Sequence, residues 1–190
     1  MLTRVAGIAL CALLAANAFA FFGETEPNNT RSAPDPLVFQ PPAYNVPWSD
    51  VGLLSLTAND SDFFKIWLNR GDWLTAITFP ISQNNTRPDT VMALFDAVGT
   101  TALVFNDDAG SIGSLGSAIR WQATASGYYF LAITGYHGFA GQNQLSYYEG
   151  VTHSETGSYI LTISVVPEPA SLIALGTGLV GLIALRRRRR

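Results

Sequence analysis

Cysteine is almost absent from this sequence: the only one among 190 residues is Cys11. It lies in an N-terminal segment with the layout of a secretory signal peptide, with a positive charge at Arg4, an apolar stretch over residues 5–14 and small residues near position 20. When residues 1–20 are removed on export, the mature chain keeps no cysteine. This excludes disulfides, a thiol nucleophile and a cysteine-based metal site. We expect packing, with a bound ion as one further contribution, to stabilise the mature protein.

Two cleavage sites fit this signal peptide. Cleavage after Ala18-Phe19-Ala20 leaves Phe21 as the first residue, and cleavage after Ala16-Asn17-Ala18 leaves Phe19. Leu10 precedes Cys11 where a lipoprotein signal has a small residue, so we expect no lipid on the cysteine. We predict a signal peptide at 1–20, one domain at 21–165, which is long enough for one core but not two, and a distinct segment at 166–190.

Positive charge is scarce between the two ends of the chain. Arg4 and residues 186–190 account for six of the eleven basic residues, whereas Glu168 is the one acidic residue of fourteen in these terminal segments. The predicted domain therefore carries a net charge of about −8 at neutral pH. Such a charge argues against nucleic acid or anionic surfaces as partners and favours cations.

Outside the signal peptide, one long uncharged apolar run is present, at residues 171–185, and five arginines follow it. With Ala170 it has 16 residues, which is about 24 Å of helix against a hydrocarbon core of about 30 Å. A helix satisfies its own backbone groups in a bilayer. Because the arginines prefer the cytoplasmic side, we expect the domain to lie outside. The alternative is a buried C-terminal helix with a basic tail.

Pro167-Glu168-Pro169 stands directly before this run. The tripeptide, the apolar segment and the arginine cluster, in this order, resemble the PEP-CTERM sorting signal of Gram-negative bacteria. The resemblance implies a transient inner-membrane anchor and cleavage near the tripeptide by an exosortase-type enzyme. It also implies release of the domain to the cell surface or the exopolysaccharide matrix.

The domain shows no convincing helical periodicity. Short apolar or alternating runs are separated by turn residues, which is typical of antiparallel strands. We predict an all-β, antiparallel, jelly-roll-like β-sandwich, with the proline-rich residues 31–48 as an extended linker or edge segment. The strands are expected at residues 51–56, 63–68, 73–79, 90–95, 101–105, 119–123, 128–134 and 159–165.

Six short blocks occur along the domain, at residues 24–29, 60–66, 71–75, 89–96, 106–108 and 126–133. In this order they resemble the bacterial pre-peptidase C-terminal domain, a β-sandwich appended to secreted proteases and related to the collagen-binding modules of clostridial collagenases. The resemblance spans roughly residues 24–165. No peptidase domain accompanies it in this sequence, so the resemblance does not extend to a role as a protease accessory.

Glu24 and Glu26 open the domain, and Asn28 and Asn29 follow. Carboxylates at alternate positions of an extended segment point the same way, and Pro27 favours that conformation for Glu26. Oxygen donors at this density suit Ca²⁺, which takes six to eight oxygen ligands. The alternative is a solvated polar segment.

The resemblance to the calcium-binding members of the family implies the same ligands. It adds Asp62, together with either Asn59 or Asp60. Asn29 stands where an aspartate is commoner, which would lower the affinity. Such a site would clamp the N-terminal segment onto the sandwich. Residues 106–108 form a second cluster of oxygen donors that could hold a cation. The alternative is that these side chains only stabilise a β-turn.

Aromatic residues gather in the predicted loop at 135–157. We expect either an exposed platform for sugar rings or plain packing of the loop. The platform would consist of Tyr136, Phe139, Tyr147 and Tyr148, beside His137. His137 and His153 lack the spaced partners of a metal or catalytic site, so we expect them to be structural or exposed.

Two functions fit these patterns. The first is a non-catalytic surface or matrix protein that binds polysaccharide or another matrix component and is stiffened by Ca²⁺. The second is a small secreted hydrolase, which would need paired carboxylates at glycosidase spacing. The pairs Asp60/Asp62 and Asp107/Asp108 lie at expected turns, and no G-x-S-x-G motif is present. We therefore favour binding and expect no enzymatic activity.

Overall fold

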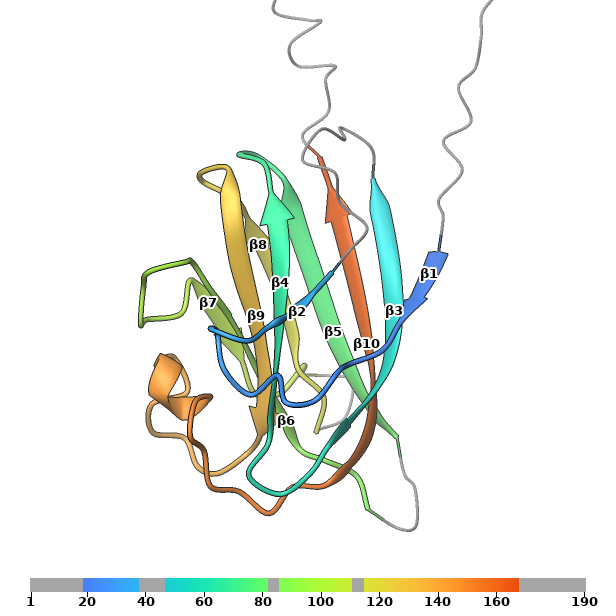
Figure 1. The fold of residues 1–190 in the computed structure, drawn as a ribbon, viewed down its shortest axis with the longest axis vertical. Helices are drawn as coiled ribbons and strands as arrows, with labels where there is room; N and C mark the ends of the chain where they lie inside the picture. Colours follow the sequence, from blue (N-terminus) through green and yellow to red (C-terminus); the bar gives the residue numbers. More distant parts are fainter. Residues whose placement is uncertain (1–18, 38–46, 82–85, 111–114, 168–190) are drawn as a thin grey trace, which may run out of the picture.

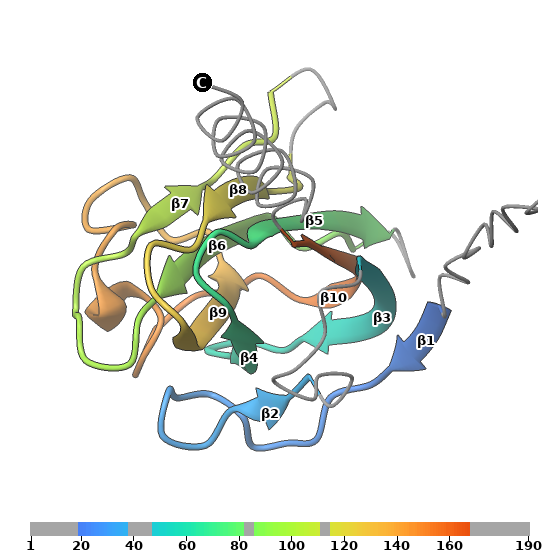
Figure 2. The same ribbon diagram turned by 90° about the horizontal axis from the view of Figure 1, so that it is seen from above.

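The computed structural model describes residues 19–37, 47–81, 86–110 and 115–167. They form two five-stranded β-sheets packed face to face, in the strand orders β1-β3-β10-β5-β8 and β2-β4-β9-β6-β7 (Figures 1 and 2). The elements are β1 (Phe19–Phe22), β2 (Asp35–Pro36), β3 (Trp48–Leu56), β4 (Ser61–Leu68), β5 (Trp73–Ile81), β6 (Thr90–Phe95), β7 (Val104–Asn106), β8 (Ala118–Gln122), β9 (Gly127–Gly135), the 3₁₀ turn η1 (Leu145–Tyr147) and β10 (Gly157–Val166).

The strands from β3 to β10 alternate between the sheets, except that β6 and β7 form a pair within one sheet, as in an eight-stranded jelly roll. The order β3-β10-β5-β8 faces β4-β9-β6-β7. All pairings among these eight strands are antiparallel. The all-β, jelly-roll-like prediction is confirmed. The predicted strand at 90–95 coincides with β6. For each of the other seven, both the first and the last predicted residue lie within three residues of the observed boundary.

The main core lies between the two sheets. In β10, alternate residues face it: Tyr159, Leu161, Ile163 and Val165 are at most 1% exposed. A second apolar cluster lies on the outer face of β4, β6 and β9, where Phe63, Val91 and Phe95 meet residues of the loop around η1. Because this loop covers the outer face, β6 is buried along its whole length instead of alternating.

The N-terminal segment runs alongside the sandwich. β1 pairs in parallel with β3, and β2 pairs in parallel with β4, so the part of residues 31–48 that the structure describes includes an edge strand, as predicted. Phe22 is 9% exposed and packs edge-on against Phe64, with ring centroids 5.7 Å apart. A Cβ at Gly52 would lie 2.8 Å from the Phe22 ring. Phe22 therefore fixes the start of the domain to the core, and both predicted cleavage sites leave it in place.

Most of the two predicted sorting segments lies outside the described residues. The structure begins at Phe19, within β1, and ends at Pro167, directly after β10. Glu168, Pro169 and the predicted apolar helix at 171–185 are not described. Within the described ranges, no helix has the length and apolar character to cross a membrane.

Candidate metal centre

Glu24, Glu26 and Asp62 converge beside the first residues of β4. Each offers one carboxylate oxygen, and these three atoms lie within 4.8 Å of one another. Asp62 is the second residue of β4. Glu24 is held near the end of β3, where its Oε1 accepts hydrogen bonds of 2.9 Å from both the backbone N–H and the hydroxyl of Ser55.

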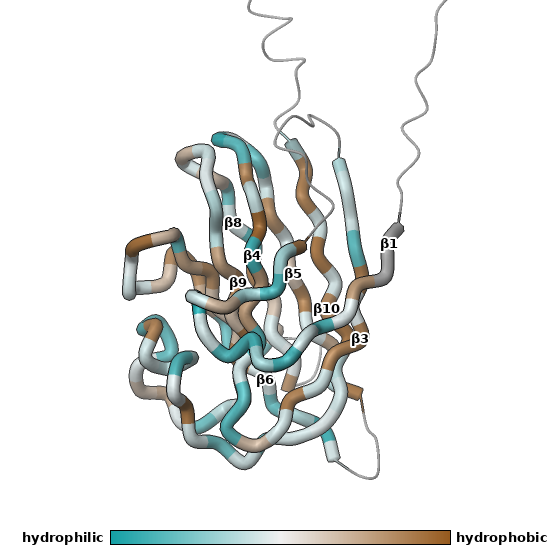
Figure 3. The backbone as a smooth tube through the Cα atoms, viewed as in Figure 1, coloured by the Kyte–Doolittle hydropathy of each residue, from teal (hydrophilic) through white to brown (hydrophobic). Residues whose placement is uncertain are grey.

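The path of the N-terminal segment explains this convergence. Figure 2 shows the segment between β1 and β2 passing beside β3 and β4, and Figure 3 shows that much of it is hydrophilic. The backbone N–H of Phe63 donates to the carbonyl of Asn28 at 3.1 Å, which places Asn28 next to Asp62. Asn28 is fully buried, and its Nδ2 donates to Asp35 at 3.0 Å.

Four side-chain oxygens of the predicted ligands are buried without a hydrogen-bond partner. They are Glu24 Oε2, Asn28 Oδ1, Asn29 Oδ1 and Asp62 Oδ1. A buried acceptor without a donor costs free energy, and native structures rarely leave several together. Every one of the four is a hard oxygen donor of the type that Ca²⁺ takes. The donor set therefore fits a hard cation.

The electrostatics of the three carboxylates point the same way. Burial raises the pKa of Asp62 well above its usual value, and the charges of Glu24, Asp60 and Glu26 raise this pKa further. Only the hydroxyl of Tyr159, which donates to Asp62 Oδ2, opposes the shift. Burial also raises the pKa of Glu24 and of Glu26. A bound cation would replace this mutual repulsion with attraction.

Asp60 and Asn59 are not among the three carboxylates that converge, and the expectation that one of them is a ligand stays a prediction. The Asp60 oxygens accept hydrogen bonds of 3.0 Å from the backbone N–H groups of Thr57 and Ser61. Asn59 has a φ of 65° and its Oδ1 accepts from the backbone N–H of His153 at 3.0 Å. Both side chains therefore stabilise the turn between β3 and β4.

The four-ring aromatic platform is also not what the structure shows. Tyr147 and Tyr148 are 5% and 0% exposed. The Tyr148 hydroxyl donates to the carbonyl of Gln142 at 2.9 Å, and its ring packs edge-on against Phe95. These two tyrosines cover the outer face of β4, β6 and β9, so they cannot contact a sugar. Phe139, 81% exposed, and the half-buried Tyr136 remain, with ring centroids 5.5 Å apart.

The two histidines differ in their surroundings. His153 is 7% exposed, and its Nε2 lies 2.7 Å from the carbonyl oxygen of Asp60. Its ring therefore stabilises the turn that carries Asp60. His137 is exposed and stacks on Tyr147 at a centroid distance of 3.7 Å. Both positions agree with the structural or exposed roles that we expected.

A second acidic region lies where β6 begins and β7 ends. Burial and the charges of Asp107, Glu155 and Asp108 raise the pKa of Asp89 to about 6. Asp107 accepts a hydrogen bond of 2.7 Å from Gln142. Among the described residues, only Glu24, Glu26 and Asp62 bring three metal-ligating side chains as close as 4.8 Å. Asp89 and Glu155 were not predicted here, because no local motif links them to the turn at 106–108.

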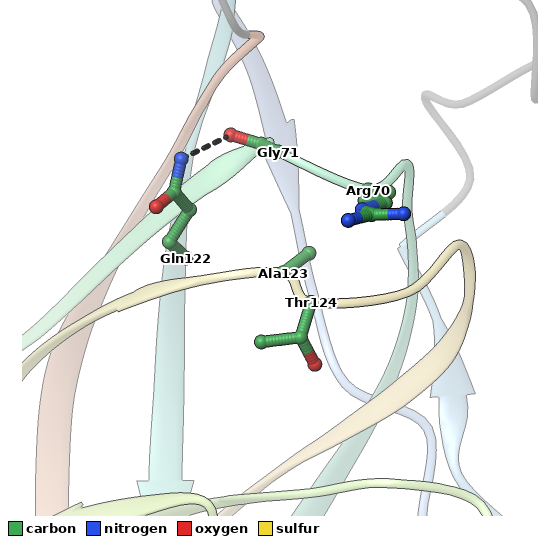
Figure 4. Close-up of a pocket in the computed structure, with 5 residues that line it drawn as sticks. All are labelled: Arg70, Gly71, Gln122, Ala123 and Thr124. Carbon is green, nitrogen blue, oxygen red and sulfur yellow. Dashed lines mark hydrogen bonds between the residues drawn. The ribbon is translucent and has the colours of Figure 1, made fainter.

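Two of the surface hollows lie wholly among the residues that the structure describes. One is lined by Arg70, Gly71, Gln122, Ala123 and Thr124 (Figure 4), and the other by Thr100, Gln144, Leu145, Ser146 and Glu149. Neither of these hollows has two carboxylates. Neither therefore offers the general acid and second carboxylate that a glycosidase needs.

The C-terminal segment can be compared with known protein families. The profile of the PEP-CTERM protein-sorting motif matches residues 165–189. The chain carries a PEP-CTERM sorting motif. This confirms the predicted signal, including Pro167-Glu168-Pro169, and the match begins one residue before the predicted boundary. The protein is exported, carries a C-terminal membrane-anchoring signal before processing, and then reaches the cell surface or the exterior. An exosortase-type enzyme is the processing partner that the motif implies.

The sandwich resembles solved structures only distantly. The periplasmic inhibitor of g-type lysozyme PliG from Aeromonas hydrophila is 15% identical with a TM-score of 0.44, and the match covers 78% of this chain and 99% of that one. The pre-peptidase C-terminal domain of collagenase from Bacillus anthracis is 11% identical with a TM-score of 0.41, covering 78% and 96%. PliG from Salmonella Typhimurium is 16% identical with a TM-score of 0.40, covering 69% and 97%. Curated proteins gave no match to the chain.

The second of these structures belongs to the family that the sequence blocks resemble. At such TM-scores the likeness carries no statement about ligand or activity.

Proposed function

We propose that the released domain is a non-catalytic binding or structural module of the cell surface or extracellular matrix, stiffened by Ca²⁺. In this proposal Glu24, Glu26 and Asp62 hold the ion and thereby clamp the N-terminal segment onto β4. The observation that carries the proposal is the set of four buried, unpartnered oxygens on the predicted ligands. A cation held by the three carboxylates would give the Glu24 and Asp62 oxygens a partner.

The type of ion follows from the donors. Carboxylate and amide oxygens, with no histidine or cysteine among them, suit Ca²⁺ and Mg²⁺ rather than Zn²⁺ or Cu²⁺. Three carboxylates with two nearby amide oxygens can approach the six to eight ligands of Ca²⁺, whereas Mg²⁺ keeps most of its waters. Calcium is also plentiful outside the cell, where the sorting motif directs the protein.

A binding role is better supported than a hydrolytic one. The two described hollows lack paired carboxylates, whereas Phe139 and Tyr136 present aromatic surface close to the acidic region around Asp107. Exposed rings of this kind can stack on sugars, so matrix exopolysaccharide is the ligand class we propose. The alternative, a small secreted hydrolase, would need a carboxylate pair that converges on a substrate.

Calcium binding can be tested by thermal unfolding of the domain from Phe21 to Pro167, which contains all strands from β2 to β10. Measured with Ca²⁺ at about 100 times its Kd and with a chelator, the stabilities should differ by about 2.7 kcal/mol, or several degrees in Tm. Asp62→Asn should abolish the difference. Asp108→Asn, an exposed carboxylate outside the group, is the matched control and should keep it.

Equal melting temperatures with Ca²⁺ and with chelator would remove the ion from the proposal. An equal response to Mg²⁺ would show that the site does not select Ca²⁺. Glycan binding is a separate question, and retention of the domain on matrix polysaccharide should be lost in Phe139→Ala while the melting temperature stays unchanged.

A further inference from the structure

The strand pairings bring all four tryptophans of the chain to one end of the sandwich, the end where β10 finishes. Figure 1 shows where β10 finishes. Trp73 pairs with Val166, the last residue of β10, and Trp48 pairs with Val165. Trp121 pairs with Leu74, one residue after Trp73. In the other sheet, Trp67 is the last residue but one of β4, which ends in the turn that leads to Trp73.

All four tryptophan side chains are only partly buried. Trp48 and Trp121 pack against the end of the main core. Trp67 and Trp73 alternate with the buried Leu68 and Leu74, so they point to the outer faces of the two sheets. Trp67 packs edge-on against Tyr128, which is 49% exposed, with centroids 4.9 Å apart.

Basic side chains accompany these rings. The Arg120 guanidinium lies 4.1 Å from the centre of the Trp73 ring, and Lys65 Nζ lies 4.6 Å from that of Tyr128. Arg70 is exposed in the turn between β4 and β5 and lines the hollow shown in Figure 4. Two carboxylates near this end, Asp50 and Asp72, are only 1% and 5% exposed. Asp96, directly after β6, is half-buried and its charge acts on Tyr129. Arg70 is thus an exposed positive group of this end, whereas Asp50 and Asp72 are withdrawn from solvent.

The chain leaves little distance between this end and the bilayer. Only residues 167–169 separate Val166 from the predicted apolar segment, which begins at Ala170. Four residue steps span at most about 14 Å, and the headgroup layer on each side of the hydrocarbon core is roughly 5–8 Å thick. While the anchor is in the membrane, the end of β10 must therefore lie at or just above the headgroups.

We propose that, in the anchored precursor, this end of the sandwich rests in the phospholipid headgroup layer. We call it the tryptophan end; it consists of Trp48, Trp67, Trp73, Trp121, Tyr128, Lys65, Arg70 and Arg120. Tryptophan and tyrosine prefer the membrane interface because their rings combine apolar and hydrogen-bonding groups. Arginine and lysine bind lipid phosphates.

The proposal is independent of calcium binding, and it refines the expectation from net charge. A charge of about −8 argues against anionic surfaces for the domain as a whole, but the charge is unevenly distributed. Asp62, at the opposite end of β4 from Trp67, lies about 17 Å away along the strand. Docking by the tryptophan end therefore points the acidic metal centre away from the bilayer and holds the sorting motif at the membrane surface.

Because all tryptophans lie at this end, intrinsic fluorescence tests the proposal directly. The full precursor, without its signal peptide, is reconstituted in vesicles of mixed zwitterionic and anionic phospholipids that carry bromine near the headgroup. We expect the tryptophan emission to be quenched relative to vesicles without bromine, and blue-shifted relative to the domain from Phe21 to Pro167 in solution. Emission that is unquenched and unshifted would overturn the proposal.

A spacer variant separates docking from mere proximity. A Gly/Ser insertion of about ten residues after Pro167 adds a flexible tether of about 18 Å. Quenching should persist in this variant, because the surface has its own affinity; loss of quenching would show that the short tether alone causes it and would overturn the proposal.

In the spacer variant, Arg70→Gln should lower the docking constant about fivefold, as expected for one basic residue at a lipid surface. Arg87→Gln removes an exposed arginine before β6, away from the tryptophan end, and is the matched control with no expected effect. Equal losses in the two variants would show that general charge, and not this surface, is responsible.

Discussion

At the scale of single residues, position within the strand-and-turn framework decides what a carboxylate does. Asp60 and Asp62 are two residues apart and both are buried, at 4% and 0% exposure. Asp60 is saturated by backbone and hydroxyl donors of its own turn. Asp62 points into the group with Glu24 and Glu26 and keeps one oxygen without a partner. The two residues look equivalent in the sequence and differ only in their partners.

Asp89 provides a test at this scale. Its pKa is raised from 3.8 to about 6 in the folded state, so the folded protein binds this proton more tightly than the unfolded chain does. The stability that the protonated carboxyl contributes is present below about pH 4 and is lost as the pH rises to about 6.

Asp89→Asn should therefore flatten the fall in melting temperature between pH 4 and pH 6, measured in the presence of chelator. Parallel curves for the variant and the original chain would contradict the assignment.

The ligands of the candidate metal centre could be found from the sequence because they lie in one short segment and one strand start. Glu24, Glu26, Asn28 and Asn29 are nearly contiguous, and the family resemblance supplied Asp62. The burial of Tyr147 and Tyr148 could not be predicted from the sequence in this way. Their burial depends on the outer face of β6, which is about 50 residues earlier in the chain.

At the scale of elements, the two sheets are joined near the start of β6 by a buried hydroxyl cluster. Thr78 in β5 and Thr90 in β6 approach to 2.7 Å between their Oγ1 atoms. The backbone N–H of Ser117 donates to Thr78 Oγ1 at 2.8 Å, and the Ser117 hydroxyl donates to the carbonyl of Thr90. All three residues are at most 1% exposed. The cluster thus ties β5 of one sheet to β6 of the other.

Replacing Thr78 by valine keeps the shape but removes the acceptor for the Ser117 N–H. A buried donor without a partner costs about 1–3 kcal/mol, and we expect Thr78→Val to lower the free energy of unfolding by that amount in chemical denaturation. Thr75→Val lies three residues earlier in β5, on the half-buried face, and should change stability by less than about 0.5 kcal/mol. Similar losses for both variants would show that the hydroxyl cluster is not the cause.

At the scale of the whole molecule, the sandwich separates two chemistries. One end carries the tryptophans, Lys65, Arg70, Arg120 and the exit of the chain toward the anchor. The other end begins β4 and β6 and carries the acidic groups around Asp62 and Asp89. Antiparallel strands make this separation possible, because residues far apart in sequence return to the same end of the sheet.

Calcium and protons should compete at the acidic end. Burial and mutual repulsion raise the pKa values of Glu24, Glu26 and Asp62 in the folded state. Without the ion, the stability contributed by these groups is therefore lost as the pH rises through their raised pKa values. Ca²⁺ binds the deprotonated carboxylates, so its stabilising effect should be larger at pH 8 than at pH 5.

The difference in melting temperature between Ca²⁺ and chelator, measured at both pH values, checks this prediction. The contribution of Asp89 cancels in that difference. A calcium effect that is equal or larger at pH 5 would mean that the ion does not bind these carboxylates.

The sequence by itself determined the compartment, the all-β class and the approximate strand positions, and it predicted most of the oxygen donors of the candidate metal centre. These properties depend on local patterns: an apolar run with charged flanks, alternation along a strand, and oxygen donors close together in one segment. Only the tertiary structure decided which turn carboxylate lies beside Glu24 and Glu26, which tyrosines are buried, and that four tryptophans spread over the chain meet at the end where β10 finishes. These depend on strand register and on which loop covers which face, and residues distant in sequence set both.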